Sequence, residues 1–228
     1  MRIPLWKKWL SYLVEFHMES APSDINPHLY VSLNRGRYQL CTANAVYSHA
    51  DLYDNFLKTF QRLRLDDLPG TEVLVLGLGL GSVPYMLERV FHRTYAYTAV
   101  EIDESVIYLA DKYGLSDLHS PMQTICADAR SFVGLTEESY DLIAMDIFLD
   151  DTVPADFESI EFLQALRELL SPGGLLLYNR LAVTKKDRQN TRTFYQDRFR
   201  RVFPEGAYLE VGGNWMLLSH PDLLKAKN

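Results

Sequence analysis

Three acidic residues of this chain each follow a short apolar run. They are Glu101, Asp128 and Asp146. Apolar runs of four to eight residues, bounded by Gly, Pro or polar residues, are typical of strands that are buried on both faces of a parallel sheet. Ligands of α/β proteins bind outside the carboxyl ends of such strands. We therefore expect the three carboxylates to lie in one site.

A glycine-rich turn precedes these acids. It reads Gly77-Leu78-Gly79-Leu80-Gly81 and follows the apolar run 73–76. Glycine lets the backbone turn sharply and lets a ligand lie against it without a Cβ clash. The helix expected next offers free N–H groups and its positive dipole end. Glu101 comes about 20 residues later, the spacing at which an acid binds the ribose of a nucleoside. The alternative is a tight strand-to-helix corner beside a solvated acid.

The acids are expected to play different roles. Glu101, beside Ile102, should bind ribose hydroxyls. Asp128 should accept a hydrogen bond from an adenine amino group, and Ala129 should supply a backbone N–H. Asp146 should face the side of the nucleoside ligand away from the adenine, where a carboxylate can orient an amine and take its proton. The alternative for Asp146 is that it caps a loop by accepting backbone N–H bonds.

The order of elements predicts the fold class. Strands and helices alternate from Thr71 onward, as in a parallel sheet with helices on both faces. Residues 207–211 and 215–220 flank Gly212-Gly213-Asn214, which predicts a hairpin. Five parallel strands closed by an antiparallel hairpin form the doubly wound, seven-stranded sheet of class I methyltransferase-like proteins, so the pattern favours a sulfonium nucleoside over NAD. The expected strands are 72–76, 95–101, 122–127, 141–147 and 174–180, and the expected helices are 82–91, 104–113, 157–170 and 187–202.

The first 47 residues are predicted to form a small antiparallel β appendage, and residues 48–228 the Rossmann-like nucleoside-binding domain. Residues 9–18 and 28–33 look extended. Residues 38–42 should pair with the second of these across the turn Asn34-Arg35-Gly36. A helix is expected at 51–63, because apolar residues recur there at helical spacing.

Composition excludes several classes of function. The chain has 228 residues, of which 47% are hydrophobic and 23% charged, which is ordinary for a globular protein. Its net charge of −7 argues against a nucleic-acid groove. No apolar run approaches the ~18 residues of a membrane helix, so we expect a cytoplasmic protein that binds no membrane. Cys41 and Cys126 are expected to be buried free thiols, and no metal-site spacing is present.

Together these motifs resemble the spermidine synthase family over roughly residues 28–200. Two further segments carry the resemblance. Tyr38-Gln39-Leu40-Cys41-Thr42, followed by Tyr47-Ser48-His49-Ala50-Asp51-Leu52, is similar to the segment around the family's nucleoside-contacting glutamine, here Gln39. Residues 140–146, followed by Leu149-Asp150-Asp151-Thr152-Val153-Pro154, resemble its catalytic strand and loop, which implies catalytic roles for Asp146 and Asp150. The family transfers an aminopropyl group from decarboxylated S-adenosylmethionine to a diamine.

The chain departs from the family where amines are bound. Leu80 stands where the family has an acid that holds the cosubstrate's amine, and Ala45 and Val46 replace an acidic pair. His49 replaces the tyrosine at the start of the next helix; it is a candidate general base or only a helix-start residue. A diamine carries two positive charges that need acids to pair with. Putrescine is therefore not expected as the acceptor.

Three hypotheses follow. The first is a spermidine-synthase-like transferase that alkylates another small-molecule amine. The second is a methyltransferase on the same fold that uses intact S-adenosylmethionine. Because position 80 is Leu and not an acid, the carboxylate of that donor would not be repelled there. The third is a non-catalytic nucleoside-binding member of the fold. A homodimer through the exposed edge of the β appendage is a further expectation.

Overall fold

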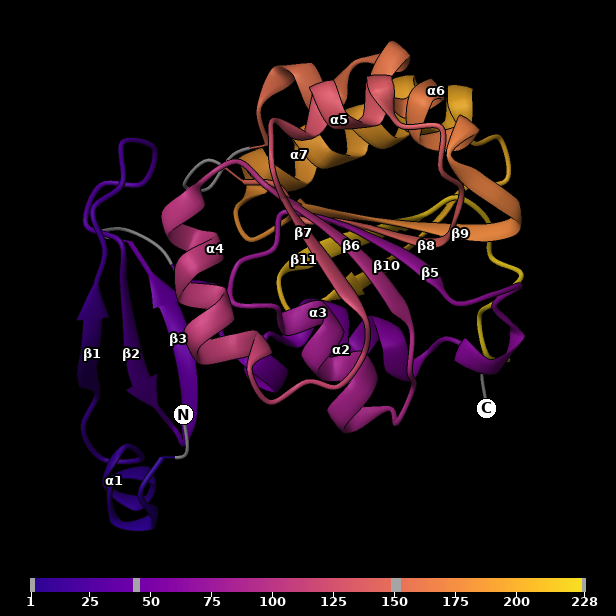
Figure 1. The fold of residues 1–228 in the computed structure, drawn as a ribbon. Coiled ribbons are helices and arrows are strands. Elements are labelled where there is room, and N and C mark those ends of the chain that lie inside the picture. Colours follow the sequence, from indigo (N-terminus) through magenta and orange to yellow (C-terminus); the bar gives the residue numbers. More distant parts are fainter. Residues whose placement is uncertain (1–2, 43–45, 149–152, 227–228) are drawn as a thin grey trace.

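The computed structural model describes residues 3–42, 46–148 and 153–226, and these form two β-sheets (Figure 1). The larger is the predicted seven-stranded sheet, with five parallel strands and an antiparallel C-terminal hairpin. In spatial order its strands are β10 (Ala207–Val211), β11 (Asn214–Leu218), β9 (Leu170–Leu181), β8 (Tyr140–Met145), β5 (Glu72–Leu76), β6 (Ala96–Glu101) and β7 (Met122–Cys126).

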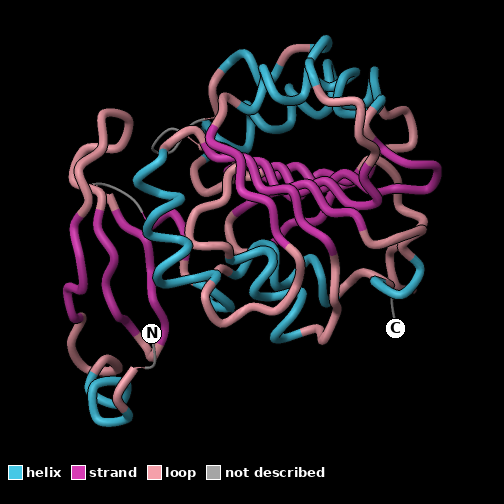
Figure 2. The backbone as a smooth tube through the Cα atoms, viewed as in Figure 1, coloured by secondary structure: helices cyan, strands magenta, loops and turns pink. Residues whose placement is uncertain are grey.

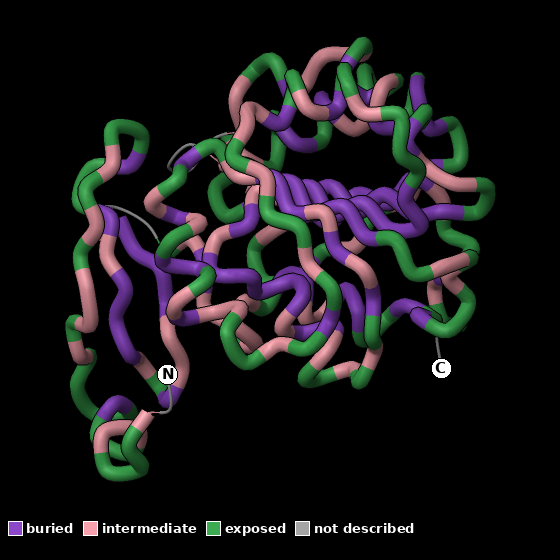
Figure 3. The backbone as a smooth tube through the Cα atoms, in the orientation of Figure 1, coloured by how far each residue is buried: buried purple, intermediate pink, exposed green. Residues whose placement is uncertain are grey.

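Helices cover both faces of this sheet, which explains why its central strands are apolar without alternation (Figures 1 and 2). One core packs α2, α3 and α4 against the sheet, and the other packs α5, α6 and α7 against the opposite face. Residues 73–76 of β5 are at most 1% exposed, and the sheet is the most continuously buried part of the chain (Figure 3). The helices are α1 (Leu5–Leu10), α2 (Asp54–Gln61), α3 (Ser82–Tyr85), α4 (Glu104–Ala110), α5 (Ala129–Leu135), α6 (Ile160–Glu168), α7 (Lys185–Phe194) and α8 (Arg200–Val202).

The strand order reverses between β5 and β8. From β5 the chain proceeds to β6 and β7 on one side, and it then returns to β8 on the other. At this point Gly77 has φ +88°, and a Cβ there would lie 2.5 Å from the backbone oxygen of Asp146. Asp146 N donates to Leu76 O at 2.8 Å. Glycine is therefore required at position 77. Because it has no side chain, the glycine turn can pack directly against the end of β8.

The N-terminal appendage is a four-stranded antiparallel sheet in the order β1-β2-β3-β4. Its central hairpin is as predicted, although the residue with positive φ beside Gly36 is Arg35 rather than Asn34. The extended segment predicted at 9–18 is wrong in its first half. Trp6, Trp9 and their apolar neighbours recur at helical spacing and form α1, and a turn separates α1 from the first strand. The strands are β1 (Phe16–Ser20), β2 (Tyr30–Asn34), β3 (Arg37–Cys41) and β4 (Val46–Ser48).

Other predicted elements needed adjustment. The helix expected at 51–63 starts only at Asp54, because Ala50–Leu52 forms a separate 3₁₀ turn and Ala50 has φ +47°. Helix α5 was not predicted. Cys41 is buried as expected, but Cys126 is exposed, because it ends β7 at the edge of the sheet.

No helix among the described residues is long and apolar enough to cross a bilayer. In the same part of the chain, no cluster of three or more His, Cys, Asp or Glu side chains could hold a metal ion.

Candidate functional site

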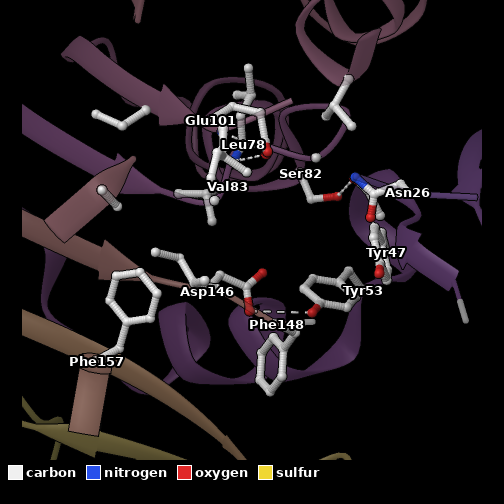
Figure 4. A pocket seen from close by; sticks show the side chains of 18 of the residues that line it. Asn26, Tyr47, Tyr53, Leu78, Ser82, Val83, Glu101, Asp146, Phe148 and Phe157 are labelled. Atoms are coloured by element: carbon white, nitrogen blue, oxygen red, sulfur yellow. Dashed lines mark hydrogen bonds between the residues drawn. The ribbon is translucent and has the colours of Figure 1, made fainter. Parts of the chain in front are cut away.

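A pocket of about 580 Å³ lies at the carboxyl edge of the parallel strands, beside the reversal in strand order. Its walls come from the glycine turn, the ends of β6, β7 and β8, the segment from β4 to the start of α2, and the turn of the C-terminal hairpin (Figure 4). This volume suits a small organic ligand. The pocket is the place where the sequence predicted the three acids to meet, and Glu101, Asp128 and Asp146 all line it.

Glu101 organises the glycine turn from the end of β6. Its Oε2 accepts from the backbone N of Leu78 at 3.2 Å, and its Oε1 accepts from Ile102 N at 2.9 Å and Asp103 N at 3.2 Å. Burial raises the pKa of Glu101, and these backbone bonds oppose the rise. Ile102 lines the pocket with it and is half exposed. Glu101 thus lies beside Leu78 of the glycine turn, on the wall of the pocket (Figure 4).

The glycines of the turn differ in their positions. Gly77 and Gly79 line the pocket, whereas Gly81 does not. A Cβ on Gly81 would lie 2.4 Å from Leu115 Cδ2, and its φ of +79° precedes the first turn of α3. Position 81 therefore needs glycine for packing and backbone conformation. Leu80 is 4% exposed and belongs to the core, so the side chain at position 80 does not reach the pocket.

Asp128 lies at the opposite end of the pocket from the C-terminal hairpin and caps α5. Its Oδ1 accepts from Ser131 N at 2.8 Å and from Ser131 Oγ at 2.9 Å. The next residue, Ala129, is buried at the start of α5 and also lines the pocket. Since both recorded bonds use Oδ1, Oδ2 is the oxygen that can accept from a ligand.

Asp146 is held by side chains from two other elements. Its Oδ1 accepts from Asn179 Nδ2 at 2.8 Å. The same oxygen accepts from Tyr53 Oη at 3.3 Å (Figure 4). Asn179 is fixed in turn, because its Oδ1 accepts from Asn214 Nδ2 at 2.9 Å. Burial raises the pKa of Asp146 to about 6, and the bonds from Asn179 and Tyr53 oppose that rise. A carboxylate with this pKa can accept a proton near neutral pH.

Tyr53 is the site residue that sequence reasoning missed. The resemblance places His49 where the family has the tyrosine of its helix start, and the sequence predicts that helix from residue 51. The 3₁₀ turn at Ala50–Leu52 delays the helix, so Tyr53 stands directly before α2 and contacts Asp146. Burial, with the nearby Asp146 charge, raises the pKa of Tyr53, which keeps its hydroxyl a donor. The sequence feature that could have identified this residue is a tyrosine immediately before Asp54, the first residue of α2.

His49 and Gln39 are not brought to the pocket. His49 Nε2 lies 3.3 Å from the backbone oxygen of Asn34, and burial lowers the pKa of its imidazole. Gln39 is buried on β3, where its Nε2 donates to Glu15 Oε1 at 3.1 Å. The side chains of His49 and Gln39 make these hydrogen bonds with residues of the appendage, whereas Tyr47 lines the pocket. Asp150, the remaining candidate, lies outside the described residues.

The charge of the pocket is one-sided. The described residues that line it include no Lys or Arg. They include five carboxylates, which are Asp54, Glu101, Asp128, Asp146 and Asp156. A concave surface that carries one sign of charge concentrates ligands of the opposite sign. This pocket is therefore suited to positively charged ligands, such as sulfonium ions and protonated amines.

Comparisons with known proteins agree with this geometry. A family model described as "Methyltransferase domain" matches residues 74–178, from β5 to β9. The structure of human Methyltransferase-like protein 13 in complex with SAH is 26% identical, has a TM-score of 0.60, and covers 75% of this chain and 82% of that one. A probable spermidine synthase from Corynebacterium glutamicum has a TM-score of 0.69 at 19% identity and covers 90% of this chain and 79% of that one.

The chain has a spermidine synthase-like class I methyltransferase fold. Among curated proteins, a polyamine aminopropyltransferase from Vibrio vulnificus is 30% identical over 153 residues, which cover 64% of this chain and 49% of that protein. An N-terminal histidine N-methyltransferase from Emericella nidulans is 34% identical over 116 residues, which cover 48% of this chain and 20% of that protein. The chain thus spans half or less of the length of these curated relatives.

The family model matches only part of the walls of the pocket. The family model begins in β5 and ends in β9, so it includes the glycine turn, Glu101, Asp128 and Asp146. The residues that the appendage and the segment before α2 contribute, among them Tyr53, lie outside the matched region.

Proposed function

We propose that this protein transfers an alkyl group from a sulfonium nucleoside, S-adenosylmethionine or its decarboxylated form, to the nitrogen of a small amine. The observation that carries the proposal is Asp146, a partly buried residue that lines the pocket, has its carboxyl pKa raised to about 6, and has its backbone oxygen against Gly77 of the glycine turn. The absence of Lys and Arg among the described lining residues supports cationic reactants. The glycine turn and Glu101 form the nucleoside end, and Asp146 with Tyr53 forms the reacting end.

The chemistry required of the protein is modest. An amine is mostly protonated near neutral pH and cannot attack until it loses a proton. The Asp146 carboxylate accepts that proton, and the nitrogen lone pair then forms a bond to the carbon beside the sulfur. The carbon–sulfur bond breaks, and its electron pair stays on sulfur, which becomes a neutral thioether. The bonds from Asn179 and Tyr53 fix the carboxylate for this step.

Two donors remain in view, and different observations favour each. The excess of acids in the pocket favours the decarboxylated donor, which carries two positive charges and no carboxylate. Leu80 favours intact S-adenosylmethionine and methyl transfer, because the position that would hold an acid for the donor's amine is filled by a core leucine. The likeness to the human methyltransferase-like protein in complex with SAH supports this second candidate.

Calorimetry separates the donors. S-adenosylmethionine, its decarboxylated form, methylthioadenosine and NAD are titrated into the protein. We expect one of the sulfur nucleosides to bind and NAD not to bind. An amine screen with the donor that binds then identifies turnover, read as release of methylthioadenosine or S-adenosylhomocysteine. Binding of NAD alone would refute the proposal, and donor binding without turnover on any amine would leave a non-catalytic nucleoside-binding protein.

Asp146→Asn tests the catalytic assignment. It should keep donor affinity within a few fold and slow turnover at least a hundredfold. In the wild type, kcat/KM should rise with pH to a plateau with a midpoint near 6, because only the ionised carboxylate accepts a proton. Tyr53→Phe removes a bond that lowers the pKa of Asp146, so the midpoint should move upward. An unchanged midpoint in Tyr53→Phe would mean that another group controls the pH profile.

A further inference from the structure

The turn of the C-terminal hairpin, Gly212-Gly213-Asn214, forms part of the wall of the pocket, to which its first and last residues contribute. Asn214 is the first residue of β11, which pairs with β9. The backbone N of Ala182, just after β9, donates to the backbone oxygen of Gly213 at 2.9 Å. The turn is therefore fixed to the end of β9, the strand that also carries Asn179.

Gly212 brings this turn against the start of α2. A Cβ on Gly212 would lie 3.2 Å from the Cβ of Asp54, and the φ of Gly212 is +56°. Asp54 directly follows Tyr53, one of the two side chains that bond the carboxylate of the proposed base. The other is Asn179, which is bonded by Asn214. The hairpin turn thus contacts both segments that hold the carboxylate.

The hydrogen bonds that link Asn214 to Asp146 have a direction. An ionised carboxylate only accepts hydrogen bonds, so Asn179 must present its NH₂ group to Asp146. The amide oxygen of Asn179 then faces Asn214, whose Nδ2 donates to it at 2.9 Å. Because Asn179 is only 1% exposed, these two neighbours and not water decide which way its amide points.

The reverse orientation of the Asn179 amide would act on Asp146 in the opposite sense. The amide oxygen would then face the carboxyl group, which is favourable only when that group is protonated and donates. A side chain without a donor at position 214 would remove the bond that holds the observed orientation. The donor of Asn214 therefore favours the ionised form of Asp146.

The other groups around the Asp146 carboxyl do not replace this bond. Among the described residues, Tyr53 is the titratable side chain that bonds it, and the raised pKa of Tyr53 keeps that hydroxyl neutral. The remaining acids of the pocket are each engaged by a neighbour of their own, and they are Asp54, Glu101, Asp128 and Asp156.

We propose that Asn214 is a positioning residue for the base. It holds the amide of Asn179 so that the NH₂ group faces Oδ1 of Asp146, which keeps the carboxylate ionised and leaves Oδ2 to the acceptor. The inference rests on the role proposed above for Asp146. It adds a residue of the C-terminal hairpin that lies outside residues 74–178, the region that the family model matches.

The protonation of Asp146 tests the inference without requiring turnover. Carboxyl ¹³C NMR of protein labelled at aspartate follows the titration, and Asp146→Asn assigns the signal. Asn214→Leu and Asn214→Ala remove the donor with and without side-chain bulk, and each should raise the pKa of Asp146 by about 0.5–1 unit. Asn179→Leu removes the bond to the carboxylate itself and should raise the pKa by about 1–2 units, the equivalent of a hydrogen bond to a charged group.

Two controls separate positioning from folding. Asn214→Gln retains an NH₂ donor on a longer side chain, so its titration should lie between those of the wild type and Asn214→Ala. Glu210→Gln changes an exposed residue of the same hairpin that does not line the pocket, and it should leave the titration unchanged.

A purely structural role for Asn214 would lower the unfolding temperature of Asn214→Leu and Asn214→Ala without moving the pKa of Asp146. That result, or a pKa that moves in Asn179→Leu alone, would overturn the inference. A pKa that moves as expected, without turnover on any amine, would count against the proposed function alone.

Discussion

Replacing Asp146 with Asn should make the fold more stable while it removes turnover. Burial raises the pKa of this carboxyl from 3.8 to about 6, which means that the folded protein disfavours the ionised form. As pH rises from about 4 to about 6, the folded state must give up a proton that it holds more tightly than the unfolded chain does. The free energy of unfolding of the wild type therefore falls across this window because of Asp146.

The size of the effect follows from the shift. A difference of roughly two pKa units corresponds to about 3 kcal/mol at 1.36 kcal/mol per unit. Asparagine is neutral at every pH and of similar shape, and its oxygen can still accept from Asn179. Its amide must itself be desolvated, however, so the net gain above pH 7 should be about 1–3 kcal/mol. Near pH 4, where the wild-type carboxyl is protonated in the fold, the gain should nearly vanish.

Urea denaturation of both proteins at about pH 4.5 and about pH 8 measures the gain. Asp156→Asn is the matched control, because Asp156 lines the same pocket but is exposed and pairs with the exposed Arg130. It should change stability by no more than about 0.5 kcal/mol at either pH. A gain of equal size at both pH values, or a loss of stability at pH 8, would refute the reasoning from buried charge.

Two other substitutions test the nucleoside end. Glu101→Gln removes the charge that we propose binds ribose, and it puts an amide NH₂ where the carboxylate accepts three backbone N–H bonds. Calorimetry should show donor affinity reduced about tenfold or more. The control Glu104→Gln, at an exposed position at the start of α4, should bind the donor normally. Gly77→Ala places a Cβ 2.5 Å from Asp146 O at φ +88°, and it should lower the free energy of unfolding, measured by thermal unfolding, by more than about 1 kcal/mol. The control is Gly134→Ala inside α5, where a Cβ would meet nothing within 4 Å. This control should raise the free energy of unfolding by about 0.5–1 kcal/mol. An equal effect at both glycines would show that the close approach at position 77 is not the cause.

The larger sheet could be predicted because its signals are local. Continuous apolar runs such as that of β5 and the glycine pair before β11 each identify their own element. Helix α5 was missed because it is short and follows Asp128 directly, so its capping acid was interpreted only as a ligand. Helix α1 was missed because it is short and none of its residues is buried, and its last two residues fell in the segment 9–18 that was predicted to be extended.

The site was predictable to the same extent. The positions of the glycine turn, Glu101 and Asp128 are set by the strand that each one follows, so they could be placed from the local sequence. All of them except Gly81 line the pocket, as predicted. The reacting end is assembled from distant segments. Tyr53 reaches Asp146 across 93 residues and Asn179 reaches it across 33, and no spacing rule connects them. Nor could spacing show that the 3₁₀ turn at Ala50–Leu52 would replace His49 by Tyr53.

The bonds of Asp146 also distinguish it from the other acids of the pocket. Asp128 and Glu101 each accept backbone N–H bonds from residues close to them in the chain or from the glycine turn, as capping residues do. The bonds recorded for the Asp146 side chain, among the described residues, come instead from the side chains of Tyr53 and Asn179 on separate elements. Both use Oδ1, so Oδ2 is the oxygen that can accept a ligand's proton. This arrangement differs from that of a loop cap, and together with a pKa near 6 it supports the base that we propose for the amine's proton.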